Sequence, residues 1–216
     1  METEAPRLRV LIIDDHPIVR RGIRALLSQW SEVKQVIEAH DGESGFREYV
    51  ETDPDIVLMD LCLPGISGFE ATRRIVARDD GAKILAFSGR GDTEFVTRAL
   101  QAGARGYLSK SCELSVLIDA LEHLASGNIY LEPEIAQRLA YQKTRGPELS
   151  FASLTTREFE IFHALADGLT AAEIALRLSL STKTVANYAT QIKNKLEVNS
   201  TVGIVRLAIR HGIVRA

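Results

Sequence analysis

Five polar residues stand at or just after the ends of short apolar runs in the first half of the sequence. They are Asp14, Asp15, Asp60, Ser88 and Lys110. Three carboxylates brought together repel one another, and burying them without a partner costs free energy. A hard divalent cation such as Mg²⁺ would relieve this repulsion through oxygen ligands. Lys110 adds a positive charge and Ser88 a hydroxyl, so the set suits phosphoryl transfer to a carboxylate, with Asp60 as the nucleophile.

A parallel sheet would bring these residues together. Short β-rich runs alternate with stretches of helical spacing, which predicts a (βα)5 doubly wound α/β domain with helices on both faces of the sheet. Ligands bind at the carboxyl ends of the strands in such sheets, so all five polar groups should meet at one edge. The predicted strands are Leu8–Ile13, Val33–Ala39, Ile56–Met59, Lys83–Phe87 and Gly106–Leu108, and the predicted helices are 17–29, 42–52, 68–79, 92–102 and 113–125.

The second half of the chain has a different character. Residues 1–127 hold 15 Lys and Arg against 21 Asp and Glu, whereas residues 151–216 hold 8 against 5. An acidic front and a basic back indicate two domains, at 6–127 and 151–216, the second suited to a polyanionic partner. Residues 128–150 contain one short amphipathic stretch, LEPEIAQRLAYQK, followed by the break TRGPELS, and are predicted to be a linker with a short helix.

Composition narrows the class of protein further. Hydrophobic residues make up 45% of the chain and charged residues 25%, which is ordinary for a soluble globular protein. No apolar run approaches the length of a membrane span, and the start METEAPRLRV lacks the apolar core of a signal peptide. Cys62 and Cys112 show neither a pairing pattern nor metal-ligand spacing. We therefore expect a cytoplasmic protein with no membrane partner.

Residues 151–216 contain no strand-like run and predict an all-α domain. The helices are expected at about 155–166, 170–178, 181–195 and 199–211, with N-caps at Thr155, Thr170, Ser181 and Ser200. The middle two helices, joined by Leu-Ser-Leu-Ser, fit a helix-turn-helix, whose second helix reads the DNA major groove. Spacing buries Val185 and Ile192 in that second helix. The predicted DNA contacts are Lys183, Thr184, Ala186, Asn187, Thr190 and Lys193.

The segments LIIDDHPIVRRGIRALL, DIVLMDLCLPGISGFEATRRI, ILAFSGR and AGARGYLSKS resemble the receiver domain of two-component response regulators, in particular the NarL/FixJ subfamily. The resemblance implies that Asp60 is the phospho-acceptor. The implied Mg²⁺ ligands are Asp14, Asp15, Asp60 and the backbone carbonyl of Cys62. Ser88 and Lys110 would contact the phosphoryl oxygens, and Tyr107 would change rotamer on activation. The Cys62 side chain departs from the common pattern, but it need not face the metal.

The segments LTTREFEI, GLTAAEIALRLSLSTKTV and IKNKLEV resemble the LuxR-type four-helix DNA-binding domain, and FASLTTREFEIF and LAIRHGI look still closer to the GacA/UvrY branch. The resemblance implies a dimer interface on the last helix. Its residues would be Val202, Val205 and Ile209. The chain departs from the common pattern at Ala186 and Tyr188, where lysine and histidine are usual. Because Asn187 can pair with adenine and Ala186 can only contact a thymine methyl, the operator can differ from the subfamily norm.

Several of these residues have simpler explanations when each is taken alone. An Asp after a strand is most often a turn former or helix cap, and Tyr107 would be a half-buried strand aromatic. The outward lysines of the basic domain would be a solvated face. We interpret His16 as a residue at the start of a helix near the acidic pocket, not as a ligand. The order of Asp14, Asp15, Asp60, Ser88 and Lys110 disfavours the simpler reading for the group.

The leading hypothesis is a DNA-binding transcriptional regulator that a sensor histidine kinase phosphorylates on Asp60, which drives homodimerisation and binding to double-stranded promoter DNA. The first helix would then carry kinase specificity, although its apolar residues could equally be core. Those candidates are Ile18, Val19, Gly22, Ile23 and Leu26.

Two other classes compete with this hypothesis. An aspartyl-phosphate phosphatase or phosphotransferase would commonly carry an acid two residues after the nucleophile, where this chain has Cys62, and would need a cap domain. We therefore expect the protein not to be an enzyme. A phosphorylation-independent DNA-binding regulator could instead use the receiver as a scaffold, and the retained acidic pair, Asp60 and Lys110 disfavour this.

Overall fold

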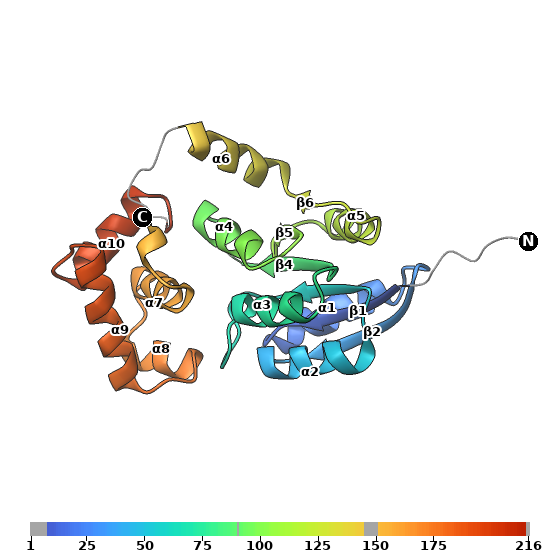
Figure 1. The fold of residues 1–216 in the computed structure, drawn as a ribbon, viewed down its shortest axis with the longest axis horizontal. Coiled ribbons are helices and arrows are strands. Elements are labelled where there is room, and N and C mark those ends of the chain that lie inside the picture. Colours follow the sequence, from blue (N-terminus) through green and yellow to red (C-terminus); the bar gives the residue numbers. More distant parts are fainter. Residues whose placement is uncertain (1–7, 90, 145–150, 215–216) are drawn as a thin grey trace, which may run out of the picture. The chain divides into compact units, whose positions relative to one another are not determined.

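The computed structural model describes residues 8–89, 91–144 and 151–214 (Figure 1). By its internal contacts the chain divides into two compact units, residues 1–91 with 99–133, and residues 92–98 with 134–216. Residues 92–98 are predicted from the sequence to lie inside the first domain, so the division by contacts differs from the predicted bounds at this short segment. Residues 145–150 of the predicted linker lie outside the described residues.

The first unit is built on a parallel six-stranded sheet in the order β2-β1-β3-β4-β5-β6. Its strands are β1 (Leu8–Ile13), β2 (Val33–Ala39), β3 (Ile56–Met59), β4 (Ile84–Ser88), β5 (Gly106–Ser109) and β6 (Tyr130–Leu131). β3 and β4 are buried along their whole length, as expected for a sheet covered on both faces. The strand order turns back at β1, which leaves a crevice at the carboxyl ends of β1 and β3.

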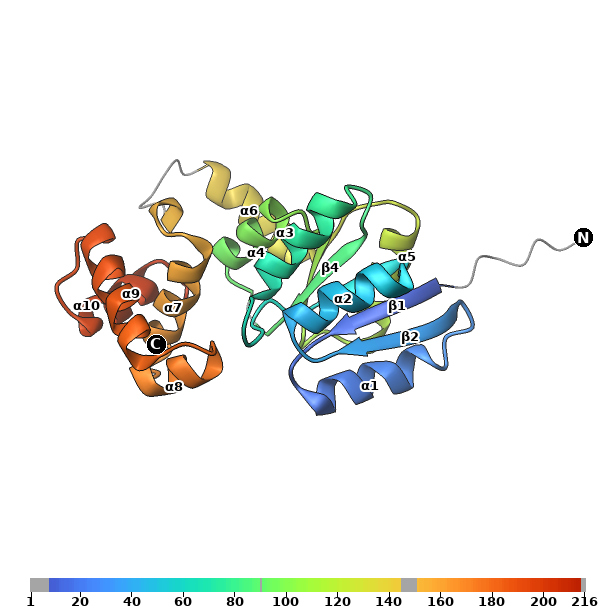
Figure 2. The same cartoon turned by 60° about the horizontal axis from the view of Figure 1, so that its bottom comes forward.

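Helices cover both faces of this sheet (Figures 1 and 2). Those of the first unit are α1 (Pro17–Leu27), α2 (Gly42–Thr52), α3 (Gly68–Arg78) and α5 (Leu114–Ala125), and α4 (Thr93–Gln101) runs across the boundary between the two units. One face is sealed by a cluster that joins apolar residues of α1 and α5, such as Leu27 and Leu121, to Ile12 and Leu58 of the sheet. On the opposite face α2 packs against β1 and against α3. The predicted alternation of strands and helices is therefore confirmed.

The sixth strand corrects the predicted sheet of five. β6 pairs in parallel with Gly106 and Tyr107 of β5, within the stretch that the sequence analysis assigned to the linker. Two residues give no periodic signal, and Pro133, two positions after Leu131, is typical of a break. The strand forms because β5 would otherwise be a free edge with unpaired backbone groups, a tertiary cause that the local pattern does not contain. β4 also begins and ends one residue later than predicted.

The second unit contains the all-α part of the chain. Its elements from residue 133 onward are α6 (Pro133–Thr144), a 3₁₀ turn η1 (Phe151–Ser153), α7 (Thr156–Ala166), α8 (Ala171–Arg177), α9 (Thr182–Lys195) and α10 (Thr201–Arg210). α7 packs against α9 and α10, and α8 packs against α9. The four predicted N-caps are confirmed, because each hydroxyl accepts a hydrogen bond from the amide three residues later. In the described part of the chain, no helix has the length and apolar character needed to cross a membrane.

Candidate functional site

An acidic pocket lies at the carboxyl ends of β1, β3 and β5. Asp14 follows β1, Asp60 follows β3 and Lys110 follows β5. The Lys110 ammonium nitrogen is 2.7 Å from an oxygen of Asp14 and 2.7 Å from an oxygen of Asp60. Both carboxylates are almost inaccessible, at 1% and 3% exposure. The sheet thus brings together three charged residues that are far apart in the sequence.

Backbone contacts fix the position of Asp60. Its amide donates to the Ile13 carbonyl at 2.8 Å, and its side chain accepts a hydrogen bond from the Cys62 amide at 3.0 Å. Gly68, the first residue of α3, lies so close that a Cβ there would overlap the Asp60 carbonyl oxygen. Gly68 is a residue that the sequence analysis missed. The only local signal was a glycine directly after Ser67, the N-cap of α3.

Burial and neighbouring charges shift the pKa values of Asp60 and Lys110. Burial raises the pKa of Asp60 above its ordinary value, and the neighbouring Asp14 adds to this, while Lys110 and the Cys62 amide oppose it. Burial by itself would lower the pKa of Lys110, but its attraction to Asp60 and Asp14 outweighs burial and raises it. Lys110 therefore stays protonated between two carboxylates. The carboxylate form of Asp60 is destabilised by burial, which favours its reaction with an electrophile.

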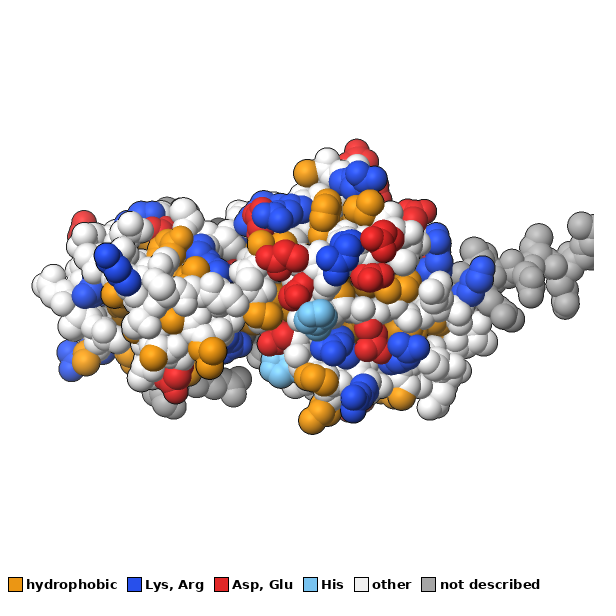
Figure 3. Space-filling view, turned by 90° about the horizontal axis from the view of Figure 1, so that it is seen from below, with side chains coloured by type: hydrophobic (Ala, Val, Ile, Leu, Met, Phe, Trp, Pro, Cys, Tyr) orange, Lys and Arg blue, Asp and Glu red, His pale blue; other side chains and the backbone are white. Residues whose placement is uncertain are grey.

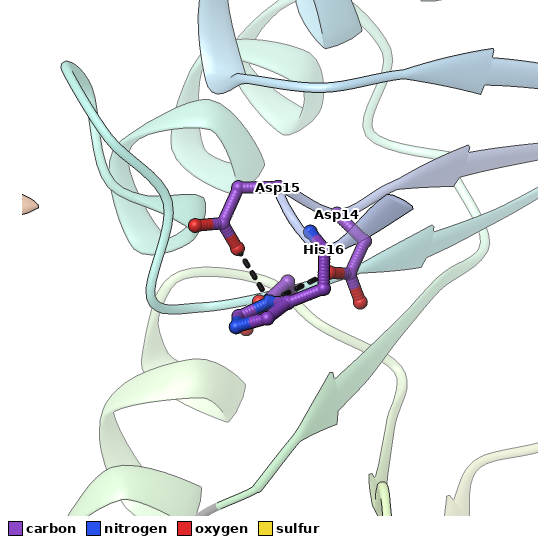
Figure 4. A group of neighbouring side chains, drawn as sticks. Asp14, Asp15 and His16 are labelled. Atoms are coloured by element: carbon purple, nitrogen blue, oxygen red, sulfur yellow. Dashed lines mark hydrogen bonds and ion pairs between the residues drawn. The ribbon is translucent and has the colours of Figure 1, made fainter. Parts of the chain in front are cut away.

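The donor set of the pocket fits a divalent cation. One ligand atom from each of Asp14, Asp15, His16 and Asp60 can be chosen so that all four lie within 4.8 Å of one another. Figure 4 shows three of these side chains converging, and acidic side chains gather beside a histidine on the face shown in Figure 3. One buried oxygen of Asp15 accepts no hydrogen bond from the described residues, whereas an oxygen of Asp14 lies 2.7 Å from the Lys110 ammonium. Carboxylate oxygens of this kind are the ligands that Mg²⁺ prefers.

Ser88 and Tyr107 lie on neighbouring strands beside the pocket. Ser88 ends β4 and is fully buried, and its carbonyl accepts a hydrogen bond from the Lys110 amide at 2.9 Å. Tyr107 is also fully buried and stands opposite Ala86 of β4 in the β4–β5 register. Their proposed roles as a phosphoryl contact and a rotamer switch stay predictions.

The second unit presents α9 as the predicted recognition helix. Val185 and Ile192 are completely buried, which turns the opposite side of α9 outward. Lys183, Ala186, Asn187 and Thr190 are exposed, whereas Thr184 and Lys193 are partly buried. The exposed side of α9 is therefore the one that carries most of the predicted DNA contacts.

Two further contacts refine that set. The ammonium of Lys195 lies 2.6 Å from an oxygen of Glu158 and ties α9 to α7, so its charge is committed within the domain. The Thr190 hydroxyl donates to the Ala186 carbonyl at 3.0 Å, so its proton is turned back to the helix. Lys183 and Lys193 are therefore better placed than Lys195 for phosphate contacts, and Thr190 is left with acceptor capacity only.

The last helix, α10, has one buried and one exposed apolar side. Ile204 and Ala208 are fully buried, whereas Val202 is 61% and Ile209 is 40% exposed, and Val205 is partly buried. Two of the three predicted dimer residues, Val202 and Ile209, thus lie exposed on α10, and Val205 is only partly covered by its own domain.

The predicted kinase-facing residues of α1 also divide into exposed and buried side chains. Ile18 is 86% exposed, but Ile23 is only 8% exposed and belongs to the core. Burial therefore removes Ile23 from the candidates, Val19 and Leu26 are partly buried against the same core, and Ile18 and Gly22 remain exposed.

The chain matches two protein-family models, the response regulator receiver domain over residues 10–122 and the luxR family of bacterial regulatory proteins over residues 152–208. It is 39% identical to the transcriptional activator protein ExaE of Pseudomonas putida, over 95% of this chain and 98% of that protein. It is 38% identical to the response regulator GacA of Pseudomonas viridiflava, over 97% and 99%. The RcsB structure from Salmonella enterica serovar Typhimurium, bound to a promoter in the presence of the phosphomimetic BeF₃⁻, matches with a TM-score of 0.64 and 25% identity, over 93% of this chain and 97% of that one.

Fold, pocket and family matches together define the class of protein. The chain belongs to the two-component response regulators that join a receiver domain to a LuxR-type DNA-binding domain, the NarL/FixJ family. Within that family it matches the GacA/UvrY branch, as the resemblance in its own segments indicated. The expected family is thereby confirmed, and it is a family of transcriptional regulators and not of enzymes.

Proposed function

We propose that this chain regulates transcription from double-stranded promoter DNA, and that a sensor histidine kinase switches it by phosphorylating Asp60. The observation that carries the proposal is the position of Lys110, 2.7 Å from both Asp14 and Asp60. A partly buried ammonium between two buried carboxylates can compensate the charge of a transferred phosphoryl group. The promoter-bound state of RcsB in the presence of a phosphomimetic supports the link between this chemistry and DNA.

In the transfer step, an ionised oxygen of Asp60 attacks the phosphorus of a phosphohistidine on the kinase. A new P–O bond forms, the P–N bond breaks, and the released imidazole leaves with the bonding electrons and takes up a proton from solvent. A bound Mg²⁺, held by Asp14, Asp15, Asp60 and the Cys62 carbonyl, would supply charge neutralisation for the phosphoryl oxygens. Lys110 would release Asp60 and pair with a phosphoryl oxygen, and the Ser88 hydroxyl would donate to another.

The switch would then pass from the pocket to the sheet. Ser88 and Tyr107 lie on paired strands, so a shift of the Ser88 hydroxyl toward the phosphoryl group changes the space beside Tyr107. A two-state rearrangement of these residues would favour a dimer through Val202, Val205 and Ile209 of α10. Two copies of α9 would then read two half-sites, which roughly doubles the number of DNA contacts.

The phosphorylation step is tested with wild type, Asp60→Asn and the control Asp119→Asn, which alters an exposed carboxylate on α5. Each protein is incubated with Mg²⁺ and acetyl phosphate, and intact mass reports the modification. Wild type and Asp119→Asn should gain one phosphoryl group and bind a palindromic site, selected from random DNA, more tightly. If Asp60→Asn binds the same DNA as tightly as the phosphorylated wild type, the protein is a phosphorylation-independent regulator and the proposal is wrong.

The dimer is tested by light scattering of the phosphorylated protein. Val202→Asp places a charge on the exposed side of α10 and should shift the mass from dimer to monomer. Leu176→Asp is the matched control, because Leu176 is an equally apolar side chain that is 85% exposed on α8. Equal loss of the dimer in both variants, or loss in neither, would exclude α10 as the specific interface.

A further inference from the structure

His16 lies in the acidic pocket and not merely near it. It is the residue directly before α1, and its side chain makes no capping hydrogen bond to that helix. The ring nitrogen Nδ1 is instead 2.7 Å from an oxygen of Asp15 and 3.1 Å from an oxygen of Asp14 (Figure 4). The sequence analysis interpreted His16 as a residue beside the pocket, because spacing along the chain does not show which way the ring turns.

The contact between His16 and Asp15 is close but is not a hydrogen bond. The Asp15 oxygen that faces Nδ1 is buried and accepts no hydrogen bond from the described residues. The proton of Nδ1, where one is present, has the Asp14 oxygen as its acceptor. Where Nδ1 carries no proton, its lone pair and the Asp15 oxygen are two electron-rich atoms 2.7 Å apart, and a cation bound to both would remove their repulsion.

The spacing of these atoms matches one edge of a metal coordination shell. In an octahedral site with metal–ligand bonds of about 2.1 Å, neighbouring ligand atoms are roughly 3 Å apart. The two separations from His16 Nδ1, 2.7 and 3.1 Å, bracket that value. Opposite ligands are roughly 4.2 Å apart in the same geometry, which fits within the 4.8 Å that encloses the four donor atoms.

We propose that His16 Nδ1 is a ligand of the divalent cation in this pocket, and that the pocket therefore prefers a first-row transition-metal dication to Mg²⁺. The inference rests on the proposed function, which places a cation among Asp14, Asp15 and Asp60. Magnesium binds almost entirely through oxygen, whereas an imidazole nitrogen adds affinity for the later first-row dications. The histidine directly after the acidic pair would thus determine which metal supports the receiver chemistry.

The test measures Co²⁺ and Mg²⁺ binding by calorimetry on the full chain at one fixed, mildly alkaline pH. Three proteins are compared: wild type, His16→Ala and His40→Ala. His40 is a matched control, because its ring nitrogen also faces a carboxylate, that of Asp41, at 3.2 Å on the surface of the same unit. In the wild type Co²⁺ should bind more tightly than Mg²⁺. His16→Ala should lose at least about tenfold in Co²⁺ affinity, and its Mg²⁺ affinity should stay within about twofold.

A second readout reports coordination directly. Co²⁺ is paramagnetic, so a histidine ring that binds it has strongly shifted proton resonances. The spectrum of Co²⁺-loaded wild type should contain one such set of imidazole signals, which His16→Ala removes and His40→Ala leaves in place. Loss of Mg²⁺ and Co²⁺ affinity by the same factor in His16→Ala, or unchanged imidazole signals, would overturn the inference, since the ring would then act only through the carboxylates.

One further arm separates this inference from the proposed function. Each protein is treated with acetyl phosphate and Mg²⁺, and the phosphoryl group on Asp60 is counted by intact mass. If wild type is phosphorylated with Mg²⁺ but His16→Ala binds Co²⁺ like wild type, only the His16 inference fails. If wild type binds neither cation and gains no phosphoryl group, the proposed function fails and the inference fails with it.

Discussion

The replacement Lys110→Met should lower the free energy of unfolding of the receiver domain. The size of this loss follows from the contacts in the pocket. The substitution keeps much of the apolar stem but removes the ammonium that lies 2.7 Å from both Asp14 and Asp60. Those carboxylates have side chains only 2% exposed, so water does not replace the lost partner. Removing one partner of a buried ion pair typically costs 3–5 kcal/mol. Because the Lys110 side chain is itself 16% exposed, at the pocket rim, we expect the lower end, about 3 kcal/mol.

Urea unfolding followed by tryptophan fluorescence measures this loss in the full chain. The sequence has one tryptophan, Trp30, which packs against the core of the first unit, so its signal reports that unit alone. A loss of about 3 kcal/mol corresponds to a fall in Tm of roughly 10 °C for a domain of this size. The control Lys83→Met removes an ammonium that bonds the Ala125 carbonyl and should cost only about 1 kcal/mol.

The double variant Lys110→Met/Asp60→Asn, compared with each single variant, completes a double-mutant cycle for the Lys110–Asp60 pair. If unpaired buried charge causes the loss, neutralising Asp60 should recover at least about 1 kcal/mol of it. The reasoning would be refuted by a Lys110→Met protein within about 1 kcal/mol of wild type, or by a double variant less stable than the single one. Either result would mean that the carboxylates are protonated or solvated in the resting pocket and do not depend on Lys110.

Three other predictions follow from named contacts. Gly68→Ala should destabilise the receiver by at least about 2 kcal/mol in the same unfolding assay, because a Cβ meets backbone, whereas Gly22→Ala, with open space around it, should not. Burial would raise the pKa of Glu158, but hydrogen bonds from Lys195 and the Thr155 amide outweigh it and lower that pKa below its ordinary 4.5. The stabilisation is therefore present above pH 4.5 and is lost as the pH falls through the lower pKa of the folded state. Glu158→Gln should thus lower the stability of the second unit at neutral pH and match wild type in acid. Unfolding followed by circular dichroism measures both. Lys183→Gln should lower affinity for all DNA sequences and reduce the salt slope by about 1, whereas Asn187→Ala should cost about 1–3 kcal/mol at one base pair.

The pocket was predictable from sequence because each of its main residues marks a strand end. Asp14, Asp60 and Lys110 follow apolar runs whose burial is dictated by composition, and a parallel sheet must bring such ends to one edge. The helix starts were predictable for a similar reason, since a hydroxyl three residues before an amide caps it locally. In these cases the strand ends and helix starts that the local pattern predicts are also those of the folded protein.

Other features have causes that no local pattern contains. β6 exists because β5 offers an unpaired edge, and the two residues Tyr130–Leu131 have no strand signal of their own. Ser179, in the turn of the helix-turn-helix, has φ of 54°, a left-handed conformation more typical of glycine. The His16 ring faces Asp14 and Asp15, its neighbours in the chain, but residue spacing alone does not show which way a side chain turns. The pairing of β6 is decided by a contact with β5 that forms only on folding.

The same charges that make the pocket reactive also make it costly to fold. Because burial raises the pKa of Asp60, the folded state favours its protonated form, and ionising it costs stability as the pH rises from the ordinary value through the raised one. The proposed role of Asp60 as phosphoryl acceptor nevertheless requires the carboxylate form. The positive charge of Lys110 offsets part of the free-energy cost of ionising Asp60 in the unphosphorylated protein, and a divalent cation would offset more of it. Under the proposed function, a phosphoryl group and a cation would act on a charge balance that is already unfavourable, so the binding of either one would favour a change of state.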